Sequence, residues 1–197
     1  MRTLIASMVM LTTIAGAAPA RAEPMTDRDR QHLLAHLDMT ESWLLTELDG
    51  LSPQQLKYRT RPGRWTIMEV AEHLAVGDSR YWQRFQDSMK QQPTGKSGIS
   101  DADILWYGID RTDREQAVQA DLPTGRWDDD KAAVAEFRKL RKEMREFAET
   151  TQEDLRAHRL VNGSMDAYQW FLMISAHTQR HILQIREIKA NPGYPKE

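Results

Sequence analysis

The chain has 197 residues, a formal net charge of −2 at pH 7 and no cysteine. Its length indicates one domain, and the absence of a large basic region argues against nucleic acid as a partner. Without cysteine there can be no disulfide and no thiolate nucleophile or metal ligand, so a metal ion would have to be held by His, Asp or Glu.

The first 22 residues have the three parts of a secretory signal peptide. Arg2 precedes an apolar run, and the segment closes with the small-residue pattern Ala20-Arg21-Ala22. The apolar run is too short and too mixed to span a bilayer, which takes about 20 apolar residues. We therefore expect cleavage after Ala22, a mature domain of residues 23–197, a periplasmic or secreted location and no association with the membrane. The alternative is an uncleaved N-terminal helix.

The rest of the chain has apolar residues at helical spacing and no run typical of a strand. We expect a first helix over residues 26–48, capped by Thr26 or the next residue, and a second over about 67–90. Thr66 precedes the second helix, and Glu69, three residues later, completes a capping box.

Residues 91–127 form a long connection rich in Gly, Pro, Asp and Thr, with a short helix expected around 101–108. Helices in bundles are normally joined by about 2–8 residues, so a connection of this length is functional or topological. A third helix is expected to start within 128–130 and end near residue 153. A fourth is expected to be capped by Ser164. Four amphipathic helices with one long crossover predict an all-α four-helix bundle.

His177 and His181 are four residues apart in an apolar part of the fourth helix. Residues with this spacing lie on one helix face, about 40° apart, and the neighbours Trp170 and Gln184 share that face. Imidazoles are costly to bury unless their nitrogens find partners, and a metal ion would satisfy both rings.

A third histidine, His73, lies among apolar residues about two turns into the second helix, so it also faces inward. In an antiparallel bundle its depth could match that of His177 and His181. Gly77, one turn later on nearly the same face, would either leave room for a ligand or permit close helix packing. Spacing alone leaves three interpretations open: a three-histidine metal site, hydrogen-bonded core histidines, or an acid–base role without metal.

The other histidines are weaker candidates. His32 and His36 are also four residues apart but have no evident third partner, and His158 is expected to be solvated in a charged loop. None of these three is a predicted metal ligand.

Two segments resemble a known family. "GRWTIMEVAEHLAVGDSRYWQRF" resembles the Trp-[Ser/Thr]-x-x-Glu-x-x-x-His segment of the DinB-like superfamily, and "DAYQWFLMISAHTQRHILQIREI" resembles its closing His-x-x-x-His segment followed by Gln. The first helix and its loop are similar too, so the resemblance covers about residues 28–190. It implies a bundle in up-down-down-up order, which would explain the long connection between the second and third helices.

The same resemblance implies a divalent metal ion, either zinc, nickel or iron, bound by His73, His177 and His181. Relatives include hydrolase-like and isomerase-like proteins and transferases that use a low-molecular-weight thiol. Relatives often pair through helix faces, and a homodimer is therefore expected.

Three neutral imidazoles would leave a divalent ion with its full charge and an open position, where water or a thiol could be activated. A hydrolase would want a general base, and the nearest carboxylates along the chain are Glu69, Glu72 and Asp78. Of these, Glu69 is also needed for its capping box, and Asp78 is expected to miss the pocket. Gln184, three residues after His181, could hydrogen-bond a ligand or only cap the edge of the core.

Aromatic residues could wall an apolar pocket beside the metal, or could be plain core. They are Trp65, Trp106, Tyr107 and Trp170. Trp106 and Tyr107 lie in the long connection, where a lid would be. We predict Gln184, Trp170 and Trp106 as residues that contact a bound ligand.

The sequence thus predicts an exported metalloprotein that takes a small-molecule substrate or ligand, through metal-dependent hydrolysis or thiol-linked transfer. One alternative is a non-enzymatic metal- or small-ligand-binding protein of the periplasm. Another is a structural bundle whose histidines only form hydrogen bonds.

Overall fold

The computed structural model describes residues 24–93, 95, 97–113, 116–160 and 163–196. In this part of the chain the regular elements are helices, apart from one isolated bridge between Arg159 and Asp166. None of these helices is long and apolar enough to cross a membrane. The signal peptide expected at residues 1–22 falls outside the described residues.

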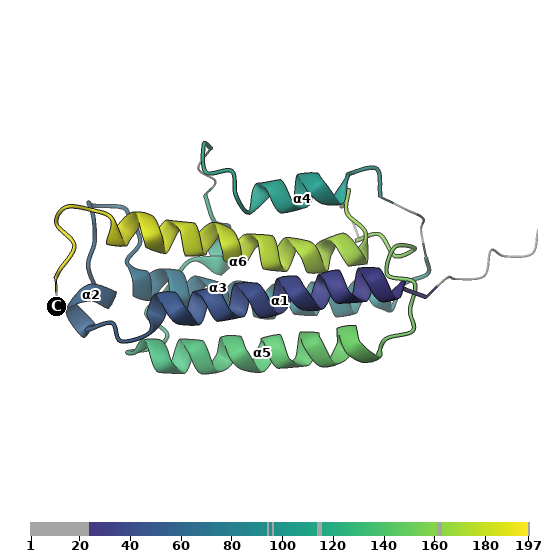
Figure 1. Cartoon of the computed structure of the whole chain (residues 1–197), viewed down its shortest axis with the longest axis horizontal. Coiled ribbons are helices and arrows are strands. Elements are labelled where there is room, and N and C mark those ends of the chain that lie inside the picture. The colour runs from purple at the N-terminus through teal and green to yellow at the C-terminus, as the bar shows by residue number, and fades with distance from the viewer. Residues whose placement is uncertain (1–23, 94, 96, 114–115, 161–162, 197) are drawn as a thin grey trace, which may run out of the picture.

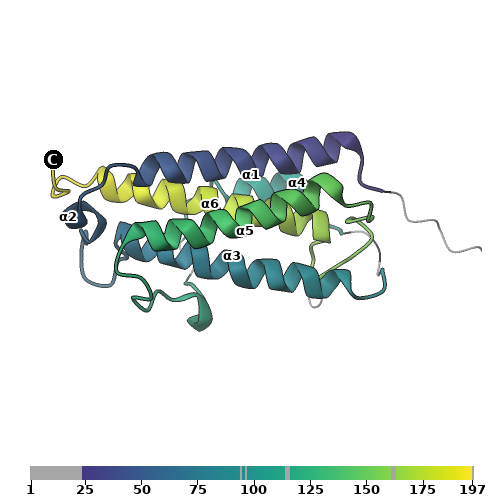
Figure 2. The same cartoon turned by 90° about the horizontal axis from the view of Figure 1, so that it is seen from below.

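Four long helices build the molecule (Figure 1). They are α1 (Asp27–Leu48), α3 (Ile67–Met89), α5 (Asp130–Thr150) and α6 (Ala167–Lys189). Each packs against two neighbours, so the order around the bundle is α1, α6, α3, α5. Helices α1 and α6 run in one direction and α3 and α5 in the other (Figures 1 and 2), which confirms the expected four-helix bundle in up-down-down-up order.

The connection between α3 and α5 is the long crossover that two consecutive parallel helices require. It contains α4 (Asp101–Tyr107), which packs along α6, and the short 3-10 helix η1 (Gln119–Asp121), which packs on α3. Figure 1 shows α4 on the outer side of α6, and Figure 2 shows the later part of the crossover beside α3. The crossover therefore covers the face where α3 and α6 meet. A single turn, α2 (Pro53–Leu56), lies between α1 and α3.

Side-chain caps determine where the long helices begin. Thr66 and Glu69 make both hydrogen bonds of the predicted capping box at the start of α3, and Thr26 caps α1 as expected. The position of His73 within α3 follows directly from this cap, because the helix starts at Ile67 and cannot begin elsewhere without losing the box.

The start of α6 differs from the sequence prediction of a Ser164 cap. Asp166 caps this helix: its carboxylate accepts from the Gln169 backbone N–H at 2.8 Å, and the Gln169 side chain accepts from the Asp166 N–H. The prediction was wrong because these two residues form a complete capping box two residues further on. Helix α5 likewise ends at Thr150, short of residue 153, because the backbone turns extended at the next residue.

His158 is buried, and the expectation that it is solvated was wrong. Its backbone carbonyl accepts a hydrogen bond of 2.7 Å from the N–H of Ala167, the first residue of α6. The loop before α6 is therefore folded against the start of the helix, and this contact buries His158.

The apolar core is divided into two parts along the bundle. One part includes Leu33, Phe85, Met144 and Phe171, and the other includes Leu48, Val70, Phe137 and Ile185. Between the two parts each long helix contributes a fully buried polar side chain, and these are Thr40, Asp78, Arg141 and Thr178. The three predicted metal ligands lie beside this polar layer, toward the α3–α6 face.

Candidate metal centre

The three predicted ligands come from α3 and α6, which pack against each other. His73 lies at the end of the second turn of α3, and His177 and His181 lie one turn apart near the middle of α6. All three side chains are buried, as their apolar surroundings in the sequence indicated. Their depths match because α3 and α6 run in opposite directions.

The Nε2 atoms of the three rings converge. The Nε2 atom of His177 lies 3.1 Å from that of His73 and 3.1 Å from that of His181. The candidate ligand atoms of the three residues all lie within 4.8 Å of one another. Among the described residues, no other group of three His, Asp or Glu side chains has the spacing of a metal site. The His32–His36 pair does not form such a group there.

Hydrogen bonds at the other ring nitrogens determine where the protons are. The Nδ1 atom of His73 lies 2.7 Å from the backbone carbonyl oxygen of Asp121, and that of His181 lies 2.8 Å from the side-chain oxygen of Gln184. Both partners are acceptors, so each Nδ1 carries the proton and donates it. The Nε2 atoms of His73 and His181 are then left with lone pairs, which is the tautomer that binds a metal.

The donor set fits a cation and does not satisfy itself without one. A neutral His177 has at most one N–H, which can donate to the Nε2 atom of His73 or of His181 but not to both. At least one of the two 3.1 Å contacts therefore brings two lone pairs together. A divalent ion held by the three Nε2 atoms would accept these lone pairs and remove the conflict between them.

The electrostatics keep all three rings neutral at physiological pH. Burial lowers the pKa of His73, lowers that of His177 well below its usual range, and lowers that of His181 to about 3, with the neighbouring histidines adding to the effect for the two α6 rings. A neutral imidazole is the form that coordinates a metal, so no proton has to be displaced before binding near pH 7.

A cavity of about 1010 Å³ opens onto the three histidines. The ring of Trp65 lies 4.7 Å from that of His73, and the ring of Tyr81 lies 5.2 Å from that of His177. The cavity thus has aromatic walls directly beside the candidate ligands, and it is large enough for a small organic molecule.

Two of the three predicted ligand-contacting residues line this cavity and one does not. Gln184 and Trp170 are lining residues, whereas Trp106 is 61% exposed and is not among them. Its neighbour Tyr107 lines the cavity instead. The reason is the close approach of α4 to α6 at Gly108, where an added Cβ would lie 2.7 Å from the backbone oxygen of Ala176, so the chain turns Trp106 outward.

Gly77 leaves space for a methyl group next to His177. An added Cβ would lie 3.7 Å from the Cε1 atom of His177, with no atom of another backbone within 4 Å. Close contact between helix backbones therefore does not require a glycine at this position. The other role considered for Gly77, room for a ligand beside the metal, stays a prediction.

The carboxylates nearest the ligands along the chain have other partners. Glu69 caps α3 and pairs with Arg59, and Asp78 pairs with Arg141 in the core, so Asp78 misses the cavity as expected. Glu72 is buried and accepts hydrogen bonds from the backbone N–H groups of residues 124 and 125, at 2.7 and 3.0 Å. None of the three is a lining residue of the cavity.

The sequence analysis did not identify Asp121, which makes two different interactions at the site. Its backbone carbonyl accepts from His73, and its buried carboxylate forms an ion pair with Arg80. Glu72 holds the segment that follows and thereby fixes this carbonyl over His73. A backbone acceptor leaves no signal in residue type, and only the length of the crossover pointed to this region.

Arg180 was missed as well. Its buried guanidinium donates to the carbonyl oxygen of Tyr107 at 3.0 Å and to those of Asp110 and Asp113, and it lies over the ring of Tyr107. These bonds attach the first part of the crossover to α6 beside the histidines.

Comparison with known proteins places this chain in a family. A sequence model of the DinB superfamily matches residues 36–185. No curated protein matches. Among solved structures, YfiT from Bacillus subtilis, described as a probable metal-dependent hydrolase with an unusual four-helix bundle topology, is similar with a TM-score of 0.59 and 15% sequence identity, over 92% of this chain and 97% of that one. At this identity the similarity shows a shared fold.

Proposed function

Because the chain belongs to the DinB superfamily and carries a buried three-histidine cluster, we propose that it is a metal-dependent hydrolase of a small molecule. The observation that carries the proposal is the convergence of three Nε2 atoms, two of them with lone pairs fixed by hydrogen bonds, at the wall of a large cavity. The description of YfiT as a probable metal-dependent hydrolase supports it.

A divalent ion, when bound, polarises a substrate oxygen and makes water a better nucleophile at neutral pH. The contribution of the chain is to hold the imidazoles neutral and oriented, with Asp121 accepting from His73 and Gln184 accepting from His181. Trp65 lies against both of these rings and restricts their movement.

Proton donors are easier to find in this cavity than bases. Burial and the nearby Asp121 charge raise the pKa of the Tyr81 phenol, so Tyr81 stays protonated at neutral pH and can donate to a leaving group. The lining carboxylates among the described residues are Asp121 and Glu187, and each is paired with an arginine. We therefore expect the proton released by the attacking water to pass to solvent or to the substrate.

The first test is the metal content of untagged protein. The wild-type chain is expected to bind about one divalent ion, and His73→Ala is expected to bind less than about a tenth as much, because two ligands do not make a site. His32→Ala, an exposed histidine on α1, is the matched control and should bind as wild type does. A His73→Ala variant with full metal occupancy would overturn the site.

The second test separates hydrolysis from the other candidate functions. Metal-free protein, alone and after addition of zinc, nickel or iron, would be assayed against nitrophenyl esters and nitrophenyl phosphate. Activity that returns with metal in wild type but not in His73→Ala supports hydrolysis. Transfer to an added small thiol under the same conditions would indicate a thiol-linked transferase, and metal binding without either reaction would indicate a non-enzymatic metal-binding protein.

We also propose that residues 1–22 are a cleaved export signal and that the mature protein is periplasmic or secreted. The support is the sequence pattern of Arg2, an apolar run and Ala20-Arg21-Ala22. Mass spectrometry of the native protein should find Glu23 at the N-terminus, and an intact Met1 in the mature pool would contradict it.

A further inference from the structure

The cavity in front of the histidines is rich in arginine, which a site made of three neutral imidazoles does not require. We propose that this cavity binds the anionic group of its substrate, a carboxylate or phosphate carried on an apolar or aromatic body. This inference rests on the proposed function only for the location of the site, because the arginines would attract an anion whether or not a metal ion is bound.

The charges that line the cavity are unbalanced. Its cationic residues are Arg61, Arg64, Arg80, Arg84, Arg111 and Arg180. The acidic residues among the described lining residues are Asp121 and Glu187. These described lining residues therefore carry four more positive than negative charges, in a chain whose formal net charge is −2. Charge of one sign in a cleft with low-dielectric walls raises the local concentration of the opposite ion.

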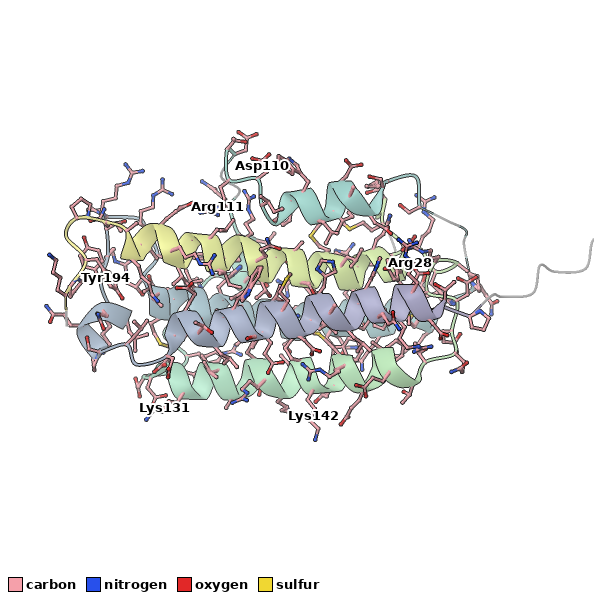
Figure 3. The ribbon with its side chains drawn as sticks, in the orientation of Figure 1. Arg28, Asp110, Arg111, Lys131, Lys142 and Tyr194 are labelled. Atoms are coloured by element: carbon pink, nitrogen blue, oxygen red, sulfur yellow. The ribbon has the colours of Figure 1, made fainter. Side chains whose placement is uncertain are left out.

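The arginines surround the cavity from several elements. They come from the loop before α3, from α3 itself, from the crossover and from α6. Figure 3 shows Arg111 on the crossover side of α6, whereas Lys131 and Lys142 project from α5 on the opposite side of the bundle. The arginines therefore reach one cavity from four separate segments of the chain.

The type of cation is also informative. All the cations that line the cavity in the described chain are arginines. A guanidinium offers a planar pair of N–H donors that matches a carboxylate or phosphate, whereas an ammonium group acts as a point charge. Arg180 in addition is held by backbone carbonyls of the crossover, so its hydrogen bonds orient it without a carboxylate cancelling its charge.

The body of the ligand follows from the size and walls of the cavity. Its volume of about 1010 Å³ far exceeds that of an inorganic anion. The rings of Trp65, Tyr81 and Trp170 line it, and Trp170 is held in place by a 2.9 Å hydrogen bond from its Nε1 atom to the backbone oxygen of Tyr81. Flat apolar walls beside arginines suit an organic anion with a ring or hydrocarbon part.

The test compares three probes by calorimetry: phenyl phosphate, benzoate and the neutral benzyl alcohol. With metal-free wild-type protein, phenyl phosphate or benzoate is expected to bind at least about tenfold more tightly than benzyl alcohol. This difference should shrink as salt is raised from about 0.05 to about 0.5 M, because exposed charges are then screened. Equal affinity for the charged and neutral probes in low salt would overturn the proposal.

The second arm uses metal-loaded protein and the double substitution Arg61→Gln with Arg84→Gln. The affinity for the anionic probe is expected to fall about tenfold or more at unchanged metal content, while Arg138→Gln, an exposed arginine on α5, should leave it unchanged. An unchanged affinity in the double variant would contradict the proposal and leave the metal site intact. Loss of the metal site would leave the metal-free arm valid, so the two proposals fail separately.

Discussion

On both α3 and α6, two consecutive residues face two different buried polar regions. Gly77 and His177 face the histidine cluster, whereas Asp78 and Thr178, the next residues along α3 and α6, face the core ion pair with Arg141. In the core ion pair the chain supplies both charges. In the histidine cluster the rings are neutral and supply no charge, so a cation that binds there would come from solution.

Both charges of the core ion pair come from the protein itself. A terminal nitrogen of the Arg141 guanidinium lies 2.9 Å from a carboxylate oxygen of Asp78 and 2.5 Å from the hydroxyl oxygen of Thr178. All three side chains are fully buried, and burial raises the pKa of Asp78 to about 6 although Arg141 acts in the opposite direction. Burying two charges is costly, so such a pair shows its value mainly when one partner is removed.

The largest effect is expected from Asp78→Ala. It leaves the Arg141 guanidinium buried without a counter-charge, and removal of one partner of a buried pair typically costs about 3–5 kcal/mol. The free energy of unfolding, from urea denaturation, measures this loss. Because Asp78 faces away from the cavity, the folded fraction should keep its metal.

The double substitution Asp78→Leu with Arg141→Met is the control for that prediction. It removes both charges and should recover most of the lost stability, since buried ion pairs are often replaceable by apolar residues of similar size. A double variant that is no more stable than Asp78→Ala would contradict this account of the ion pair. A single variant that loses its metal while folded would show that the two polar regions are not independent.

Added metal should stabilise the folded chain through the histidine cluster and not through the core ion pair. An ion that binds only the folded chain stabilises it by about 2.7 kcal/mol at 100 times its Kd and about 4.1 kcal/mol at 1,000 times. Wild type and Asp78→Ala should gain equally in a denaturation series with and without zinc. His177→Ala should gain nothing, and a gain equal to that of wild type would mean that the ion binds elsewhere.

The two buried polar regions differ in how far the sequence could predict them. The histidine cluster was predictable because His177 and His181 repeat at helical spacing on an apolar face, and because the capping box at Thr66 sets the depth of His73. The four helices were predictable from the same periodicity.

The core ion pair was not predictable, because Asp78 and Arg141 are far apart in sequence and charged residues in a helix normally face solvent. The backbone carbonyl of Asp121 carries no signal in its residue type. The arginines of the cavity are dispersed over separate segments, so only the folded arrangement shows that they share one wall.

Gln184→Ala should have a smaller effect, confined to the metal. The Gln184 side chain accepts the hydrogen bond from Nδ1 of His181 and so fixes its tautomer. Loss of such a partner typically lowers metal affinity about 10–100-fold. A competition titration with a chromophoric chelator measures this, and Gln179→Ala on the same helix is the control. Equal affinity of both variants for zinc would show that Gln184 only caps the core.

The smallest effect, and the finest test of the comparison, is expected from Gly77→Ala. Alanine is favoured over glycine inside a helix by about 1 kcal/mol, and the added Cβ would make one ordinary contact of 3.7 Å with the ring of His177. The variant should therefore be more stable by up to that amount in urea denaturation. Gly108→Ala is the opposite control, because its Cβ would lie 2.7 Å from the backbone oxygen of Ala176 and must push α4 away from α6.

Metal content and probe binding then decide what the space at Gly77 is for. If Gly77→Ala is more stable, keeps its metal and loses affinity for phenyl phosphate, the ligand occupies the space beside His177. If the variant loses its metal, the rings need that space in order to close around the ion. A variant less stable than wild type would mean that α3 and α6 approach more closely at Gly77 than the structure shows. In the first two outcomes, a helix-weakening glycine is accounted for by the histidine cluster and not by the core ion pair one residue away.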